Sequence, residues 1–176
     1  MLIRTIAEFE HALVRDLRLA AVRDAPSCFA ESEPEVSAKP ESYWQDLTCA
    51  LTSTHVMFVA ETDGVPRGSV YGLPDNNNPG GGRVGGMWVD SSYRRRGLGR
   101  ELLQGVENWA REQGFSTIRL WVPTHSAEAC GLYSGFGFAF TGETKSAEGD
   151  SPFVVLEMIL NLSADADSTT VPSTRP

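Results

Sequence analysis

Two patterns of apolar residues alternate along the chain. Short, largely apolar segments, typical of strands, occur at 2–6, 55–61, 67–73, 84–90, 117–122, 138–144 and 152–160. A helical spacing of three to four residues occurs from 7 to about 24, around 43–47, between 98 and 114, and at 126–134. Phe9, Leu13, Leu17 and Ala20 mark the apolar face predicted for the first helix. This order of elements predicts an α/β domain around a mixed sheet.

Polar segments separate these elements. The Asp63-Gly64 pair predicts a hairpin turn between two antiparallel strands. Residues 27–40 are expected to form an irregular, acidic loop, and residues 75–82 a flexible connection. We expect one domain over 1–162, followed by a disordered polar tail over 163–176.

Composition narrows the classes of function. The 176 residues are 41% apolar and carry a net charge of −8, so a general nucleic-acid surface is not expected. Three widely spaced cysteines fit neither a disulfide framework nor a zinc site, and no metal is predicted. The sequence contains no apolar run that approaches the length of a membrane span and no apolar signal region at its start, which favours a cytoplasmic protein without membrane partners.

Basic residues are concentrated at one point of this acidic chain. Arg94, Arg95, Arg96 and Arg100, together with Gly97 and Gly99, lie where a strand ends and a helix begins. Glycines allow close approach of the backbone, and the free amides and dipole of a helix start attract anions. The segment is therefore predicted to bind the pyrophosphate of a phosphorylated cofactor.

Two motifs together resemble one enzyme family. The run 89–100, VDSSYRRRGLGR, resembles the acetyl-CoA-binding motif of the GNAT superfamily of N-acetyltransferases. The segment 126–138, SAEACGLYSGFGF, resembles a second motif of that family at the expected distance. The resemblance covers roughly residues 1–160 in element order. It implies a mixed, mostly antiparallel central sheet of about six to seven strands flanked by about four helices.

The resemblance also implies how acetyl-CoA would be bound. Backbone groups of the strand would pair with the pantetheine arm, the helix start would hold the pyrophosphate, and Ser126 would stand where the family usually has an asparagine. The implied cofactor-binding residues are Met87, Trp88, Val89, Arg94, Arg95, Arg96, Gly97, Leu98, Gly99, Arg100, Ser126 and Tyr133. The sequence leaves open whether the arginine side chains meet an outer phosphate or are only solvated. A Gly85-Gly86 pair within the strand favours a β-bulge that opens its backbone.

The same resemblance implies that Tyr133 is the general acid that protonates the departing thiolate. A phenol has a pKa of about 10 and a thiol a pKa of about 8.5, so this proton transfer costs little free energy. The alternative is a tyrosine that fills the core. The general base stays unassigned, because Trp121 stands where some relatives have a glutamate. Glu61 and Glu157 lie within predicted strands, and their side chains could face the cleft, the sheet edge or solvent.

The implied activity is acetyl transfer to a primary amine by direct attack in a ternary complex. Glu31 and Glu33 are candidates for binding the amine and would favour a small cationic acceptor. The alternatives are a non-catalytic acyl-CoA sensor, or an enzyme that acetylates a protein N-terminus or lysine. Relatives often pair, so a homodimer is an open expectation.

Overall fold

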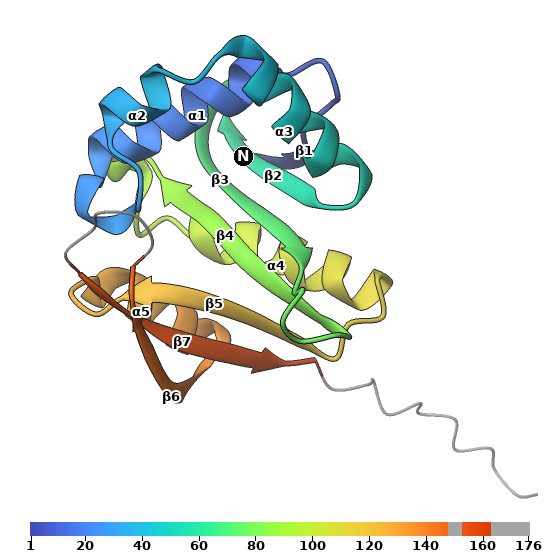
Figure 1. Ribbon diagram of the computed structural model, residues 1–176, viewed down its shortest axis with the longest axis vertical. Coiled ribbons are helices and arrows are strands. Elements are labelled where there is room, and N and C mark those ends of the chain that lie inside the picture. Colours follow the sequence, from blue (N-terminus) through green and yellow to red (C-terminus); the bar gives the residue numbers. More distant parts are fainter. Residues whose placement is uncertain (148–152, 163–176) are drawn as a thin grey trace, which may run out of the picture.

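The computed structural model describes residues 1–147 and 153–162. Seven strands form one sheet in the order β1-β2-β3-β4-β5-β7-β6 (Figure 1). They are β1 (Leu2–Thr5), β2 (Val56–Thr62), β3 (Val65–Pro74), β4 (Gly81–Val89), β5 (Thr117–Pro123), β6 (Ala139–Ser146) and β7 (Val154–Asn161). Neighbouring strands are antiparallel except β4 and β5, which are parallel. The predicted mixed, mostly antiparallel sheet is confirmed.

Helices lie on both faces of this sheet. They are α1 (His11–Asp24), α2 (Glu33–Ser37), α3 (Glu41–Ser53), α4 (Leu98–Glu112) and α5 (Ala127–Phe136), with short 3₁₀ turns η1 (Pro26–Cys28) and η2 (Ser91–Tyr93). Figure 1 shows α1, α2 and α3 gathered at the β1–β4 end of the sheet, whereas α4 lies behind it. The helices thus leave part of one face, over β5 and β7, uncovered in that view.

Two apolar cores hold the layers together. The apolar stripe of α4 packs mainly against β2, β3 and β4 in the first core, where Leu102, Val106 and, from β7, Met158 are fully buried. The second core joins α1 and α3 to the other face and contains Leu17, Trp44, Val59 and Trp88. Each such side chain contributes about 1.5–3 kcal/mol through its burial.

The first helix begins later than predicted. It starts at His11 rather than near residue 7, and Phe9 is 81% exposed instead of lying on the buried face. The carboxylate of Glu10 accepts hydrogen bonds from the Ala7 amide and from Arg4, each at 2.8 Å, and this holds residues 7–10 in a turn. A local side-chain bond thus replaces the first helical turn.

Two segments expected to be irregular are ordered. The predicted loop over 27–40 contains α2, because Ser32 and Glu35 form a capping box around its start. The connection over 75–82 is a tight turn, in which the Asp75 amide donates to the Gly81 carbonyl at 2.9 Å and the Asp75 carboxylate accepts from the Asn77 amide at 3.1 Å. The predicted tail over 163–176 and the predicted strand start at Pro152 lie outside the described residues.

Candidate active site

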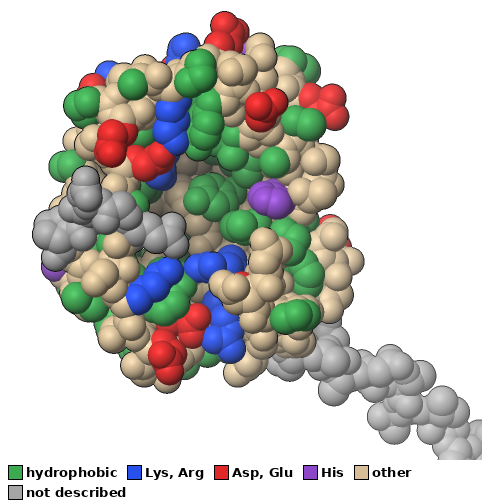
Figure 2. Space-filling model, in the orientation of Figure 1, with side chains coloured by type: hydrophobic (Ala, Val, Ile, Leu, Met, Phe, Trp, Pro, Cys, Tyr) green, Lys and Arg blue, Asp and Glu red, His purple; other side chains and the backbone are tan. Residues whose placement is uncertain are grey.

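The central feature of the site is the separation of β4 from β5. These parallel strands pair at three positions, which end at Arg83 and Arg119, although β4 continues to Val89 and β5 to Pro123. A cleft of about 1460 Å³ opens where they part, between η1, the start of α4 and α5. Figure 2 shows one face of the molecule hollowed at its middle, with apolar side chains inside and basic side chains on either side.

A β-bulge shapes the wall of this cleft. Ser69 pairs with Trp88 and Tyr71 pairs with Gly85, so two residues of β4, Gly86 and Met87, oppose one residue of β3. Gly86 has a φ of +58°, and a Cβ at either Gly85 or Gly86 would lie 2.3 Å from the Tyr71 ring. The bulge predicted from the glycine pair is confirmed, and the two glycines provide the space that the Tyr71 ring occupies.

Beyond the bulge, β4 presents an open backbone edge to the cleft. The Asp90 amide donates to the Arg67 carbonyl of β3 at 2.8 Å. Since backbone groups alternate between the two edges of a strand, those of Trp88 face β3, and those of Met87 and Val89 face the gap beside β5. These are the positions predicted to pair with an extended ligand.

The start of α4 forms a second wall with free donors. Gly97 caps the helix in the left-handed conformation, with a φ of +91°, and Arg95 has a φ of +62°. Across the residues that the structure describes, the amides of Gly97, Leu98 and Gly99 donate no hydrogen bond. Left-handed residues among successive free amides form a concave anion site. Gly99 also allows α5 to approach, since a Cβ there would lie 2.9 Å from Leu132.

The four arginines of this segment are in different environments. Arg94 is bound on both sides, because it pairs with Asp24 and donates from Nε to the Val89 carbonyl at 3.0 Å. Arg96 lies over the Tyr93 ring at 4.9 Å, and Arg100 donates to the Gly135 carbonyl at 3.1 Å. Arg95 lines the cleft and has no side-chain partner among the described residues. Arg95 is therefore the arginine that is free to meet a phosphate.

Nearly all of the predicted cofactor-binding residues lie together in this cleft. Its lining includes Met87, Trp88, Val89, Arg94, Arg95, Gly97, Leu98, Gly99, Arg100, Ser126 and Tyr133. Arg96 is not part of the lining. Trp88 also donates from its indole nitrogen to the Asp24 carboxylate at 3.0 Å.

Tyr133 lies deep in the cleft on α5. Its side chain is buried and packs edge-on against Phe138, with 5.8 Å between the ring centroids. Burial raises the pKa of Tyr133 well above its usual range, and the neighbouring thiols of Cys130 and Cys28 act in the same direction. The phenol therefore carries its proton throughout the neutral pH range, as a proton donor must.

The two predicted acceptor-binding glutamates are already paired. Glu31 lines the cleft but accepts from Arg18 at 2.7 Å and from Lys39. Burial acts to raise the pKa of Glu31, but the hydrogen bonds from Lys39 and Arg18 outweigh it and lower the pKa. Glu33 pairs with Arg23 at 2.7 Å and lies outside the cleft lining. Glu31 and Glu33 are thus neutralised by basic partners, whereas Glu35 of the same loop lines the cleft and accepts hydrogen bonds from Ser32.

The candidates for a general base are also engaged. Glu61 pairs with Arg4 and Glu157 with Arg119, at 2.8 and 2.7 Å, and neither lines the cleft. Trp121 does line it, beneath the ammonium of Lys145 at 4.6 Å. The structure therefore provides no carboxylate where some relatives of the resembled family have one.

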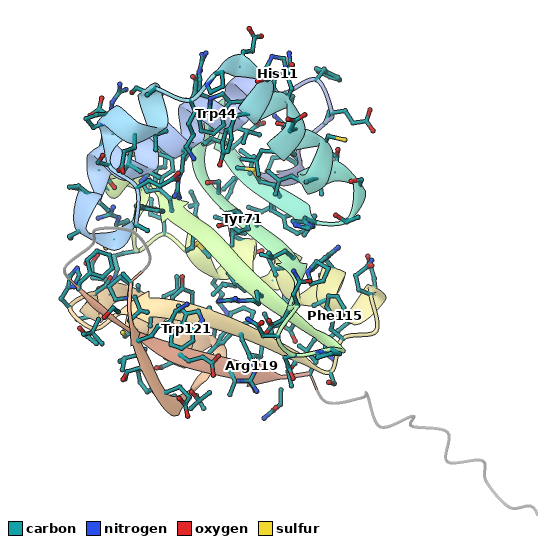
Figure 3. All side chains as sticks on the ribbon, in the orientation of Figure 1. His11, Trp44, Tyr71, Phe115, Arg119 and Trp121 are labelled. Atoms are coloured by element: carbon teal, nitrogen blue, oxygen red, sulfur yellow. The ribbon has the colours of Figure 1, made fainter. Side chains whose placement is uncertain are left out.

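Two residues important to the site were missed by sequence reasoning. Tyr71 lies at the centre of the view between Trp44 and Trp121 (Figure 3) and separates the cleft from a smaller chamber. Asp24 joins the end of α1 to Trp88 and Arg94. A tyrosine opposite a Gly-Gly pair is a signal that could have indicated Tyr71, whereas nothing local indicates Asp24.

Comparisons with known proteins agree with this geometry. A model of the acetyltransferase (GNAT) family matches residues 19–138, more than half of the chain. The mouse protein named probable N-acetyltransferase family 8 member 5 is 33% identical over 102 residues, which cover 56% of this chain and 45% of that protein. Human N-acetyltransferase 8 is 38% identical over 58 residues, covering 33% of this chain and 26% of that protein. The chain spans about half the length, or less, of the curated relatives it matches.

Solved structures match over a larger share of the chain. Ribosomal-protein-alanine N-acetyltransferase from Brucella melitensis has a TM-score of 0.75 at 22% identity, covering 92% of this chain and all of that one. The protein yncA from Salmonella typhimurium, solved with its cofactor acetyl-CoA, has a TM-score of 0.75 at 18% identity, covering 97% and 99%. These likenesses show the fold.

Among the described residues, no helix is long and apolar enough to cross a bilayer.

Proposed function

Because this chain belongs to the acetyltransferase (GNAT) family, we propose that it transfers the acetyl group of acetyl-CoA to a primary amine of a small molecule. The observation that carries the proposal is the parting of β4 from β5 beside the free amides at the start of α4. An extended, phosphorylated carrier needs both features: a strand edge to pair with and a concave set of donors for its diphosphate.

The residues present fit that cosubstrate. The amides of Gly97, Leu98 and Gly99 would hold the diphosphate, and Arg95 would add a charge at the same end. The free edge of Met87 and Val89 would pair with the amide groups of the pantetheine arm. When bound, acetyl-CoA supplies an acyl group activated as a thioester.

Tyr133 would act as the proton donor. Its pKa, raised by burial, keeps the hydroxyl protonated, so it can deliver a proton to the departing sulfur. The hydroxyl makes no hydrogen bond within the described part of the chain, which leaves it available for that role. Much of the acceleration would come from holding the amine and the carrier together in one cleft.

The acceptor would be a small amine that is cationic in solution. Loss of its proton costs about 4–5 kcal/mol at pH 7 for an amine of pKa near 10.4. Glu31 and Glu35 line the cleft, but hydrogen bonds lower the pKa of each carboxyl group. Burial acts to raise the pKa of Glu31, and its hydrogen bonds to basic side chains outweigh that effect, whereas the pKa of Glu35 is lowered by hydrogen bonds from Ser32. Neither is a strong base, so the amine would lose its proton to water in the open cleft.

Two measurements test the proposal. Calorimetry should show uptake of acetyl-CoA and of CoA, and a screen of primary amines should release CoA thiol in proportion to acetylated product. No uptake of either ligand at millimolar concentration would overturn the proposal. Uptake without transfer to any amine would instead favour a sensor of acyl-CoA.

A further inference from the structure

A second cavity adjoins the cleft at Tyr71. This chamber has a volume of about 270 Å³ and lies between α1, α3 and the face of β2, β3 and β4. The cleft and the chamber share four lining residues: Arg18, Glu31, Tyr71 and Gly86. The chamber therefore opens beside the β4 bulge, where the proposed reaction would take place.

The walls of the chamber are mostly apolar. They include Val14, Leu17, Ala21, Leu47, Leu51 and Met57. The charged residues in the lining, Arg18 and Glu31, pair with each other at 2.7 Å. A cavity of about 150 Å³ with apolar walls is enough to bind benzene, so this volume admits a ring or a short alkyl chain.

One polar group in the wall lacks a partner. Trp44 is 2% exposed and lines the chamber, and its Nε1 makes no hydrogen bond to any residue that the structure describes. Buried indole N–H groups usually find a partner, because an unpaired buried donor is costly. An apolar group in the chamber would leave this donor unpaired, so the volume and the apolar walls carry the inference, and the Trp44 indole serves as a reporter of occupancy.

We propose that the chamber binds an apolar group of the acceptor, so that the substrates are primary amines with one compact hydrocarbon or aromatic substituent. This inference rests on the proposed function and specifies its substrate class. The amine would remain in the cleft beside Gly86, while its substituent passes Tyr71 into the chamber. A polyamine would fit poorly, because a second ammonium group would lie among apolar walls whose only carboxylate is already paired.

A matched pair of amines tests this specificity. Hexylamine and 1,6-diaminohexane share a six-carbon chain, and the diamine carries a second ammonium group on the terminal carbon that is a methyl group in hexylamine. We expect kcat/KM to be at least about tenfold higher for hexylamine. Equal values, or a preference for the diamine, would overturn the inference while leaving acetyl transfer itself established.

A blocking variant tests where that preference arises. Leu47→Trp enlarges a half-buried residue of the chamber wall, and Leu19→Trp makes the same change at a half-buried residue of the second core that lines neither cavity. Leu47→Trp should raise the KM for hexylamine about tenfold, so that the kcat/KM values of hexylamine and 1,6-diaminohexane become similar. Leu19→Trp should preserve the preference for hexylamine. An unchanged preference in Leu47→Trp would place the apolar group elsewhere.

A binding measurement separates this inference from the proposed function. Hexylamine should shift the indole N–H resonance of Trp44 in the NMR spectrum of the full chain, with the signal assigned by its loss in Trp44→Phe. A shift without any acetyl transfer would support the chamber and overturn the enzyme. Acetylation of hexylamine without a shift of this resonance at saturating amine would overturn the chamber and support the enzyme.

Discussion

The thiol of Cys28 lies 3.9 Å from the hydroxyl of Ser126. Cys28 belongs to η1, just after α1, and Ser126 precedes α5, so this contact joins two sides of the cleft. Both residues lie in the lining, and the Cys28 thiol also influences the pKa of Tyr133. Chemical modification of the Cys28 thiol should therefore alter the active site.

Alkylation of Cys28 should block acetyl transfer. The experiment uses a Cys49→Ser background, because Cys49 is exposed and would react as well, whereas burial raises the pKa of Cys130 and slows its reaction. N-ethylmaleimide should abolish most activity, and bound acetyl-CoA should protect it. The Cys28→Ser, Cys49→Ser double variant should keep its own starting activity after treatment. Full activity with a Cys28 adduct seen by mass spectrometry would contradict the prediction.

Gly97→Ala should weaken acetyl-CoA binding about tenfold, or about 1.4 kcal/mol. Gly97 has a φ of +91°, and a left-handed alanine costs about 1–2 kcal/mol, which would turn the amides of the helix start away from the diphosphate. Gly114→Ala is the matched control, since Gly114 follows the other end of α4 with a φ of +73°. Calorimetry should show a similar loss of stability in both variants but unchanged affinity in Gly114→Ala. Equal affinities in the two variants would contradict this role of Gly97.

Arg95→Gln should lower the affinity for acetyl-CoA several-fold without lowering Tm. Among the described residues, the Arg95 side chain has no partner, and it lines the cleft, so its charge is available to a phosphate. Added salt should therefore reduce the difference in affinity between the variant and the parent protein.

Arg94→Gln should lower the stability of the protein and leave its affinity for acetyl-CoA unchanged. It loses the contacts with Asp24 and Val89 and about 1 kcal/mol of stability, measured by denaturant unfolding. The opposite pattern would assign the phosphate to Arg94.

The parts of this site that depend on local sequence were predictable. The cradle at the start of α4 is encoded within a few residues, because Gly97 supplies the left-handed cap and the helix supplies the free amides. The bulge was likewise indicated by Gly85 and Gly86. By contrast, α2 was missed because five residues within a polar run carry no apolar period, and only the Ser32–Glu35 capping box indicates it.

The chamber could not have been predicted in the same way. It needs Tyr71 from β3 to lie against the glycines of β4, and Trp44 from α3 to close the other side. These residues are far apart in the sequence, and their meeting depends on strand register and helix packing. The neutralisation of Glu31 has the same origin, because Arg18 and Lys39 reach it from different helical segments. Charge counted along the sequence therefore could not show that Glu31 and Glu33, the two predicted acceptor-binding residues, are neutralised by basic partners.

Tyr133→Phe should lower kcat by about 100-fold or more while leaving the affinity for acetyl-CoA unchanged. The variant keeps the ring that packs on Phe138 and removes only the hydroxyl. Tyr93→Phe is the control, because Tyr93 also lines the cleft and its ring lies against Arg67 and Arg96 through its face. It should retain kcat within a few-fold.

The pH dependence of kcat gives a second test of the same role. A general acid must be protonated, and the pKa of Tyr133 is raised by burial, so protonation is complete at neutral pH and persists above the usual phenol pKa of about 10. The parent enzyme should therefore show a rising limb, as the amine loses its proton, and no falling limb up to about pH 9.5. A falling limb near pH 8 that disappears in Tyr133→Phe would mean that the phenol ionises far more easily than its burial allows. An unchanged kcat in Tyr133→Phe would show that Tyr133 only packs in the core and is not the general acid.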